Sequence, residues 1–496
     1  MGILPFREYL LYFVKTFAYS WEKGELHSAI GEELPMNFKS FKLVYLAFCM
    51  PFVLAYVSWR FFPIFAQWLI LDVLGYTVVA RATSDLWYQF VAFFYGWYTF
   101  LAIGIAGFWA VAANHARKQH LKTESPHRPM VSFVVPAYNE EKKVSRCISS
   151  LFRCAEKYKE PCEIIVVDDG SSDYTYEVAW SSIELNRRKY PKVHGKVVRH
   201  SVNLGKVEAI RTGMNKALGS VIAVVDADSW WLPETLVKLV DYMFSNGKKA
   251  VTGYVHPSDG VDELSPYVIL QQLEYSQGLG VGRCAQSLGN NVLVVSGAIG
   301  LFDANALRQI LSEKNVHSVT EDLEITLEMH KRGAEVGYVS AAASSTAVPE
   351  SFNILWSQRL RWFTGWLYNT LGIHRQLLLK KSWLPRLLWY CYIFEYGGAL
   401  IDLTALTTFP FLFWFAPDRI LFIINFMIFA TYGLIIGALS QAIALKYAYN
   451  KHNYKSLLFY TPYYPILRLI NIFARLTSSV RYLLGDHGSW HKNLKP

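Results

Sequence analysis

Two acidic residues near the middle of the chain have the spacing of a divalent-cation site. Asp226 and Asp228 directly follow the apolar run 221–225, and on extended backbone side chains two residues apart point to the same side. Carboxylate oxygens are hard ligands that suit Mg²⁺ or Mn²⁺, and substrate phosphates commonly complete the coordination of such an ion. The pair therefore predicts a site for a cation and a phosphorylated ligand, with a solvated turn as the alternative interpretation.

Three other polar motifs could contribute to the same site. Asp168–Ser171 follows the apolar run 164–167, Lys206 begins a helix-like stretch, and Thr320–Asp322 begins another. A lysine and the free N–H groups at the start of a helix both favour a phosphate. Taken singly, Asp168–Ser171 is as typical of a turn and helix cap as it is of a ligand site.

Strands and helices must position these motifs. Through residues 131–350, apolar runs such as 131–135, 164–167 and 221–225 alternate with helix-like patterns, and each run ends in polar residues. Strand, polar turn and helix in repetition are typical of a parallel α/β sheet. Ligands bind at the carboxyl ends of such strands, so the predicted site lies at that edge of the sheet.

The composition indicates a polar domain joined to membrane segments. The 496 residues are 52% hydrophobic and 16% aromatic, which excludes a disordered chain. The six cysteines lack paired spacings, which argues against a disulfide-built module and a zinc site. The net charge of +10 is spread along the chain, so no nucleic-acid partner is predicted.

Long apolar segments flank the predicted α/β domain. The segments 43–62, 87–113, 387–416 and 420–445 are long enough to cross a membrane, whereas 64–80 is expected at the outer interface or as a re-entrant segment. Flanking basic residues place the domain in the cytoplasm of an integral membrane protein. The predicted divisions are 1–41, an interfacial segment; 42–114, transmembrane; 131–350, catalytic; 351–382, interfacial helices; 383–447, transmembrane; and 448–496, an interfacial helix and cytoplasmic tail.

Two acidic residues fall inside the apolar segment 387–416. Glu395 and Asp402 are seven residues apart, so they lie on one helical face. Acids inside a membrane commonly mark a polar pathway. The alternative is a helix at the interface with both acids in water.

In order along the chain, six motifs resemble those of the inverting family 2 glycosyltransferases. They are Val134–Glu140, Asp168–Ser171, Asn203–Lys206, Asp226–Asp228, Thr320–Asp322 and Gln358-Arg359-Leu360-Arg361-Trp362. The last has the Gln-x-x-Arg-Trp pattern of the membrane-embedded branch that includes hyaluronan, chitin, cellulose and poly-N-acetylglucosamine synthases. The resemblance implies a GT-A-type α/β domain, Rossmann-like with a mainly parallel sheet, inserted between transmembrane and interfacial helices.

The resemblance also implies roles on the donor side. Residues in contact with a UDP-sugar would be Ala137, Tyr138, Glu140, Asp168, Asp169, Lys206, Asp226 and Glu321. The first loop, with Asp168 or Asp169, would hold the uridine, and Lys206 would assist there or at the diphosphate. Asp228 would bind the Mn²⁺ or Mg²⁺ that bridges the diphosphate, with Asp226 nearer the sugar and ribose.

On the acceptor side, the resemblance makes Asp322 the general base that removes the proton from an acceptor hydroxyl. Arg361 would neutralise the leaving diphosphate, Trp362 would stack on the acceptor sugar, and Gln358 would flank the site. One positioned carboxylate suffices for this step, because cations offset the charge of the leaving group. In-line attack inverts the anomeric centre, so an α-linked donor gives a β-linkage.

Three functions fit these roles to different degrees. The first is processive synthesis of a β-linked polysaccharide from UDP-GlcNAc or UDP-Glc, coupled to translocation across the membrane. The second is transfer of one or a few sugars to a lipid acceptor at the cytoplasmic face. The Gln-x-x-Arg-Trp pattern favours the first, and the small number of apolar segments favours the second. Intact Asp228, Asp322 and Arg361 disfavour the third, a receptor that only binds.

Two positions depart from the family pattern or match it weakly. Asp303 follows Phe302 where relatives often have arginine, which leaves the acceptor open. The tail 488–492 is similar to the Trp-x-Lys/Arg loops that close over the nucleotide, and a disordered basic tail is the alternative.

Overall fold

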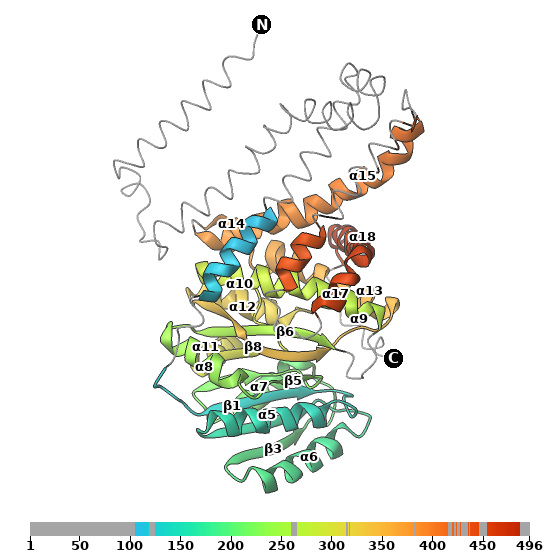
Figure 1. Cartoon of the computed structure of the whole chain (residues 1–496). Helices are drawn as coiled ribbons and strands as arrows, with labels where there is room; N and C mark the ends of the chain where they lie inside the picture. Colours follow the sequence, from blue (N-terminus) through green and yellow to red (C-terminus); the bar gives the residue numbers. More distant parts are fainter. Residues whose placement is uncertain are drawn as a thin grey trace, which may run out of the picture. The chain divides into compact units, whose positions relative to one another are not determined.

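The computed structural model describes the α/β region and most of the helices that follow it (Figure 1). The described residues are 105–118, 125–258, 265–313, 316, 318–380, 382–414, 419–420, 423, 427, 435, 437–445 and 454–486. The chain divides into two compact units, Met1–Leu46 and Ala47–Pro496, and every described residue belongs to the second. Predictions on 1–41, 43–62, 64–80, most of 87–113 and the tail 488–492 lie outside the described residues.

Eight strands form one sheet in the order β3-β2-β1-β4-β7-β6-β8-β5. Their bounds are β1 Val131–Ala137, β2 Cys162–Asp168, β3 Val193–Arg199, β4 Val221–Val224, β5 Ser229–Trp231, β6 Ala250–Ser258, β7 Gly300–Asp303 and β8 Val336–Ala347. The predicted α/β class is confirmed, and the three apolar runs named above are β1, β2 and β4.

The sheet is mixed but mainly parallel, as predicted, because six of its eight strands run in the same direction. Strands β3, β2, β1 and β4 are parallel, and so are β6 and β8, but β7 is antiparallel to both of its neighbours and β5 is antiparallel to β8. Strand β7 is antiparallel to β4 because of the place where β7 starts. Gly300 pairs with Val224 at the end of β4, so β7 begins at the edge where β4 finishes and must run back.

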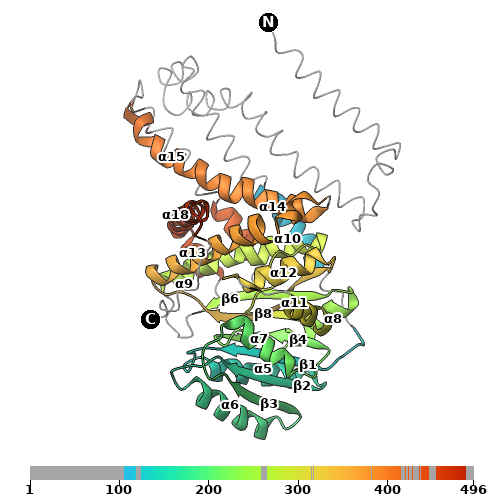
Figure 2. The same ribbon diagram turned by 180° about the vertical axis from the view of Figure 1, so that it is seen from behind.

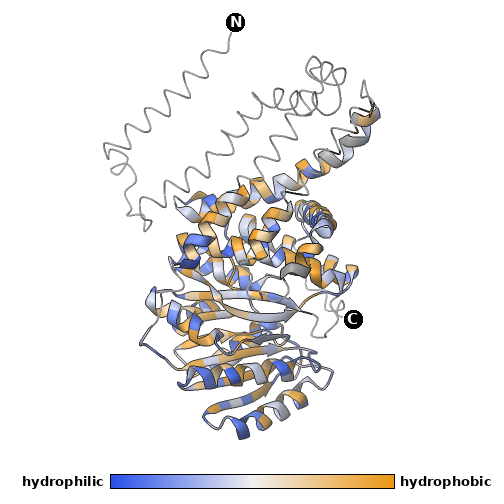
Figure 3. Ribbon diagram, viewed as in Figure 1, coloured by the Kyte–Doolittle hydropathy of each residue, from blue (hydrophilic) through white to orange (hydrophobic). Residues whose placement is uncertain are grey.

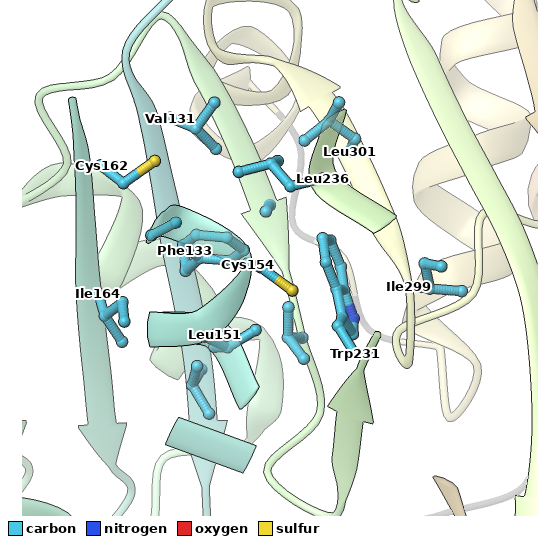
Figure 4. Close-up of a cluster of buried hydrophobic side chains, with 14 of the residues drawn as sticks. Val131, Phe133, Leu151, Cys154, Cys162, Ile164, Trp231, Leu236, Ile299 and Leu301 are labelled. Atoms are coloured by element: carbon cyan, nitrogen blue, oxygen red, sulfur yellow. The ribbon is translucent and has the colours of Figure 1, made fainter. Parts of the chain in front are cut away.

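Helices pack on both faces of the sheet. Their bounds are α5 Val144–Tyr158, α6 Thr175–Lys189, α7 Lys206–Asn215, α8 Thr235–Ser245, α9 Pro266–Tyr275, η1 Ser276–Arg283, α10 Cys284–Gln286, η2 Ser287–Gly289, α11 Ala304–Glu313 and α12 Glu321–Lys331. Phe133 packs with Leu151 and Trp231 on one face (Figure 4), and Val134 packs with Ile210 on the other. Burial on both faces explains why the strands are continuous apolar runs.

A second group of helices follows the sheet. Their bounds are α13 Phe352–Leu367, η3 Tyr368–Ile373, η4 Arg375–Leu379, α14 Trp383–Tyr390, η5 Cys391–Tyr396, α15 Gly397–Trp414, α17 Tyr454–Phe459, η6 Thr461–Tyr463 and α18 Tyr464–Leu483. Helix α18 packs against α13 and α15 (Figure 2). Within the described ranges, no helix combines the length and the apolar character needed to cross a membrane.

The two acids of the segment 387–416 are paired with arginines of α18. Arg475 Nη2 lies 3.1 Å from Glu395 Oε2, and Arg468 Nη2 lies 2.7 Å from Asp402 Oδ2. The arginines are seven residues apart, like the acids, and they pair in the opposite order along the chain. The acids therefore link η5 and α15 to α18 in this structure.

Candidate active site

Lys206 joins two acidic residues that are far apart in the sequence. Its Nζ donates to Asp226 Oδ1 and to Glu321 Oε1, both at 2.6 Å. Burial acts to lower the pKa of Lys206, but the facing carboxylates outweigh it and raise the pKa. Burial acts to raise the pKa of Glu321, and the ammonium group of Lys206 lowers it. The result is a charged bridge from the carboxyl end of β4, through the start of α7, to the start of α12.

Asp322 lies beside this bridge, in the first turn of α12. Its Oδ1 accepts the backbone N–H of Leu323 at 2.8 Å. Burial, with the neighbouring charge of Glu321 acting in the same direction, raises the pKa of Asp322 to about 6 against the opposing charge of Lys206. Such a carboxyl group is ionised at neutral pH and more basic than an ordinary aspartate, which suits removal of a proton from a hydroxyl.

Arg361 of α13 brings a second cation to the same region. Its Nη1 donates to the carbonyl oxygen of Val319 at 3.1 Å, just before the acids of α12. Its positive charge also contributes to the lowered pKa of Glu321. Because Arg361 is exposed, it can meet a negatively charged ligand beside Asp322.

Asp226 and Asp228 lie on a tight turn, so the expectation of extended backbone between them is wrong. The N–H of Ser229 donates to the carbonyl oxygen of Asp226 at 2.9 Å, because β4 connects to β5 over only a few residues. The side chain of Asp226 pairs with Lys206. That of Asp228 has Ser229 Oγ at 3.4 Å and Thr346 Oγ1 at 3.5 Å from its Oδ1.

The donor set around Asp228 fits a hard divalent cation. The carboxylate is half-buried and has hydroxyl oxygens around it, and oxygen donors suit Mg²⁺ and Mn²⁺. In the part of the chain that the structure describes, no group of three or more His, Cys, Asp or Glu side chains could hold a metal by itself. An ion bound here would therefore take further oxygens from a ligand such as a diphosphate.

Asp168 is engaged within the protein. It is 0% exposed, and its Oδ2 lies 3.0 Å from Nε of Arg199, the last residue of β3. Its Oδ1 accepts the N–H of Ser171 at 3.3 Å, in the way of a turn. Its predicted contact with uridine would require this ion pair to rearrange, and it stays a prediction.

Asp169 holds the loop that leads into Lys206. It is 2% exposed. Its carboxylate oxygens accept the N–H groups of Leu204 and Gly205 at 2.9 and 2.8 Å, and Nδ1 of His200 lies 2.8 Å from Oδ1. Gly205 has a φ of 98°, a left-handed conformation that favours glycine. Asp169 thus fixes the start of α7, whereas its predicted contact with uridine is untested.

The first loop packs against the second at the same edge of the sheet. The carbonyl oxygen of Ala137 accepts the N–H of Asp169 at 2.8 Å, and the N–H of Glu140 donates to Thr175 Oγ1 at 2.7 Å. Tyr138, between them, is half-buried. Because β1 lies between β2 and β4, the structure places this loop at the strand ends where the Lys206 bridge starts.

Helix α13 carries the whole Gln-x-x-Arg-Trp pattern. Trp362 is half-buried, and the guanidinium group of Arg359 lies over its ring, 4.5 Å from the centroid. Among the residues that the structure describes, none forms a hydrogen bond with the buried Oε1 of Gln358. All the residues of the pattern therefore lie on one helix. Among them, Arg361 is the residue that contacts the segment just before Glu321.

Gly297 lies against the bridge, a contact that the sequence did not reveal. A Cβ at this position would lie 2.9 Å from both carboxylate oxygens of Asp226 and from Lys206 Nζ. A side chain here would therefore displace the carboxylate or the ammonium group of the bridge. The local sequence, a Ser-Gly pair before an apolar run, does not indicate this contact. The pocket at this point is lined by Lys206, Ile210, Val224, Val295, Ser296, Gly297, Phe302, Leu307, Glu321, Asp322 and Ile325.

Asp303 lies outside the residues that line this pocket. It accepts the N–H of Ala306 at 2.9 Å, near the start of α11, and its Oδ2 lies 3.0 Å from Lys249 Nζ. Phe302, before it, does line the pocket. The departure from the family pattern at Asp303 thus serves a helix start and a surface ion pair.

Comparison with known proteins identifies the domain that carries this site. Residues 132–311 match the model of Glycosyl transferase family 2. This match confirms the predicted glycosyltransferase domain and, with it, the prediction of an enzyme. The match includes the bridge residues Lys206 and Asp226, whereas α12 and α13 follow it in the chain.

Curated relatives share the same region. Poly-beta-1,6-N-acetyl-D-glucosamine synthase of Staphylococcus epidermidis is 29% identical over 265 residues, which are 53% of this chain and 59% of the relative. The protein of the same name from Staphylococcus aureus strain COL is 29% identical over 245 residues, which are 47% of this chain and 54% of the relative. The chain thus spans somewhat over half the length of the curated relatives it matches.

Two solved structures are similar at low identity. The mannosyltransferase PcManGT from Pyrobaculum calidifontis, in complex with GDP-Man and Mn²⁺, has a TM-score of 0.45 and 16% identity, covering 77% of this chain and 99% of its own. The crystal structure of S. aureus TarS 1-349 in complex with UDP-GlcNAc has a TM-score of 0.35 and 15% identity, covering 72% of this chain and 92% of its own.

Proposed function

We propose that the protein is an inverting glycosyltransferase that transfers a sugar from a UDP-sugar to a glycan acceptor and forms a β-linkage. The observation that carries the proposal is the Lys206 bridge, whose ammonium group lies 2.6 Å from both Asp226 and Glu321, beside Asp322. The carboxylate of Asp226 for the donor, the ammonium group of Lys206 for a phosphate and the basic carboxyl group of Asp322 therefore lie close together in a GT-A-type domain.

The donor binds along the carboxyl ends of β1, β2 and β4. The loop of Ala137, Tyr138 and Glu140 holds the uridine, and Asp226 contacts the ribose and sugar. Asp228 would hold a divalent cation, Mn²⁺ or Mg²⁺. When bound, this cation would offset the negative charge of the diphosphate. When the donor binds, Lys206 exchanges one of its carboxylate partners for a phosphate oxygen. The ammonium group is partly buried, and this exchange keeps its positive charge paired with a negative one.

Proton removal from the acceptor is assigned to Asp322. In its ionised form it accepts the proton of an acceptor hydroxyl as the oxygen attacks the anomeric carbon, and the bond to the diphosphate breaks on the opposite side. Lys206 and Arg361 face the negative charge that develops on the departing diphosphate. One displacement inverts the anomeric centre, so an α-linked donor yields a β-linked product.

The donor is of the UDP-GlcNAc or UDP-Glc class, and UDP-GlcNAc is the first to test. Support comes from the curated relatives, whose name is poly-beta-1,6-N-acetyl-D-glucosamine synthase. We further propose that synthesis is processive and coupled to translocation. The Gln-x-x-Arg-Trp pattern on α13, with Arg359 stacked on Trp362, supports an acceptor that remains bound between transfers.

The protein is proposed to be integral to the cell membrane, with the catalytic domain in the cytoplasm and lipids around its apolar helices. Support comes from the many hydrophobic residues along those helices (Figure 3). Several large apolar side chains there are exposed, including Trp389, Leu400 and Leu483 at 47%, 57% and 83%. Arginines stack on tryptophans at Trp383 and Trp414, and aromatic and basic residues together are typical of a membrane interface.

The proposal is tested with the full chain purified in detergent and incubated with a panel of UDP-sugars and Mn²⁺. Release of UDP shows the donor, and sizing with glycosidase digestion shows the product. A long β-linked glycan from one UDP-sugar is expected. A single sugar on a lipid extracted with the enzyme would replace processive synthesis by the lipid-acceptor alternative, and binding of UDP without transfer would contradict the proposal.

A further inference from the structure

Arg359 is a charged residue that the proposed reaction does not use, yet it is 2% exposed. Its Nη2 donates to Oε2 of Glu274, on α9, at 2.6 Å. The other carboxylate oxygen of Glu274 accepts Nδ2 of Asn471, on α18, at 2.7 Å. Three helices that are distant in sequence therefore meet at the carboxylate of Glu274.

The same guanidinium group covers one face of the Trp362 indole, with its carbon 4.5 Å from the ring centroid. Residues three apart on a helix lie on the same side of it, so Arg359 and Trp362 meet without distortion of α13. A planar cation over a tryptophan ring is an attractive arrangement with a preferred orientation. Because one face of the indole is occupied, a sugar ring can stack only on the opposite face.

We propose that Arg359, held by Glu274, which Asn471 holds in turn, is a positioning residue that sets the orientation of Trp362 for stacking on the acceptor sugar. The inference rests on the proposed function, since it requires a sugar acceptor. Its alternative is helix packing alone. A partly buried ion pair generally stabilises a fold no more than apolar residues of similar size would, so packing gives little reason for a charged residue at this place.

A matched control lies one turn along the same helices. Arg475 of α18 lies over the ring of Phe363, 4.6 Å from its centroid, and 3.1 Å from Oε2 of Glu395. This second arginine has the same two kinds of contact as Arg359, with an acid and an aromatic ring, but its ring is not Trp362. Glu395→Gln therefore removes a comparable ion pair without acting on the indole.

The test measures the acceptor KM and the UDP affinity of the purified full chain, with a β-linked N-acetylglucosamine tetrasaccharide as acceptor. Arg359→Lys, which retains the charge and loses the planar group, is expected to raise the acceptor KM by about fivefold or more. The UDP affinity is expected to stay at the parent value. Glu274→Gln is expected to act in the same direction, and Glu395→Gln is expected to leave the acceptor KM unchanged.

A double substitution separates positioning from packing. In a Trp362→Ala background, where elongation is expected to be lost, the affinity for the tetrasaccharide is measured by calorimetry instead. Arg359→Lys is expected to have no further effect on this affinity, because the group through which it acts is gone. An unchanged acceptor KM in Arg359→Lys, or an added effect in the Trp362→Ala background, would overturn the inference. If Arg359→Lys does not fold, Glu274→Gln decides in the same way. Failure of the parent itself to transfer any sugar would instead contradict the proposed function.

Discussion

Replacement of Asp322 by asparagine is expected to remove activity and to stabilise the fold. The pKa of Asp322 is raised from 3.8 to about 6, first by burial and then by Glu321. A tenfold change in acidity corresponds to about 1.4 kcal/mol, so the ionised carboxyl destabilises the folded chain by about 2–3 kcal/mol above about pH 6. Asparagine is of the same size and uncharged, and its carbonyl oxygen can still accept the N–H of Leu323.

The dependence on pH has a definite sign. Because the pKa of Asp322 is higher in the folded chain than in the unfolded chain, the folded chain loses stability as the pH rises from about 4 to about 6. Asp322→Asn and the parent should therefore melt together at about pH 4, and the variant should melt about 2–3 °C higher at about pH 7.5.

Thermal unfolding of the purified full chain, followed by fluorescence across this pH range, measures the difference. Asp303→Asn is the matched control, because it removes a carboxylate that does not line the pocket. Asp303 pairs with Lys249 and accepts an N–H of α11. The control is expected to melt below the parent at neutral pH. A lower melting temperature for Asp322→Asn at neutral pH, or a difference that does not grow with pH, would refute the reasoning.

The same substitution tests the role of the base. The transfer rate of the parent is expected to fall with an apparent pKa of about 6 on the acid side, because the base must be ionised. Asp322→Asn should lose transfer while its UDP affinity stays near the parent value. Turnover within about tenfold of the parent would contradict the assignment, since general-base catalysis commonly contributes more than that.

Three further substitutions have distinct expected results. Asp228→Ala should lose the Mn²⁺ dependence of UDP binding in calorimetry, and unchanged metal-dependent affinity would rule out its role. Gly297→Ala should fold, because its Cβ meets only the ends of side chains at 2.9 Å, but it should weaken UDP binding about tenfold, or roughly 1.4 kcal/mol. Gly278→Ala is the control, because its Cβ would meet no described atom within 4 Å. Trp362→Ala should lose roughly one kcal/mol or more of acceptor stacking and hydrolyse donor without elongation, so full-length product would contradict the acceptor platform.

The sequence predicted the elements that carry the site because its signals are local. Apolar runs marked β1, β2 and β4, and the polar residues after them do lie at one edge of the sheet. Lys206 begins a helix as expected, and Glu321 begins another. The acids Asp168 and Asp169 were less predictable, because a carboxylate that binds a nucleotide and one that fixes a loop have the same local pattern.

The remaining features depend on contacts between distant parts of the chain. The antiparallel placement of β7 follows from pairing of Gly300 with Val224. The role of Gly297 follows from its approach to Asp226 and Lys206. Arg359 lies two residues before Arg361 in the sequence pattern, but its partner Glu274 is 85 residues away. No local periodicity indicates such partners.

The anomeric configuration of the product tests the central claim most directly. The purified full chain is given UDP-α-N-acetylglucosamine labelled with ¹³C at the anomeric carbon, Mn²⁺ and the tetrasaccharide acceptor, and the new linkage is observed by NMR. A single displacement with Asp322 as base predicts a β-linked sugar, formed by the parent and absent with Asp322→Asn. An α-linked product, or a β-linked product made equally well by Asp322→Asn, would contradict the account.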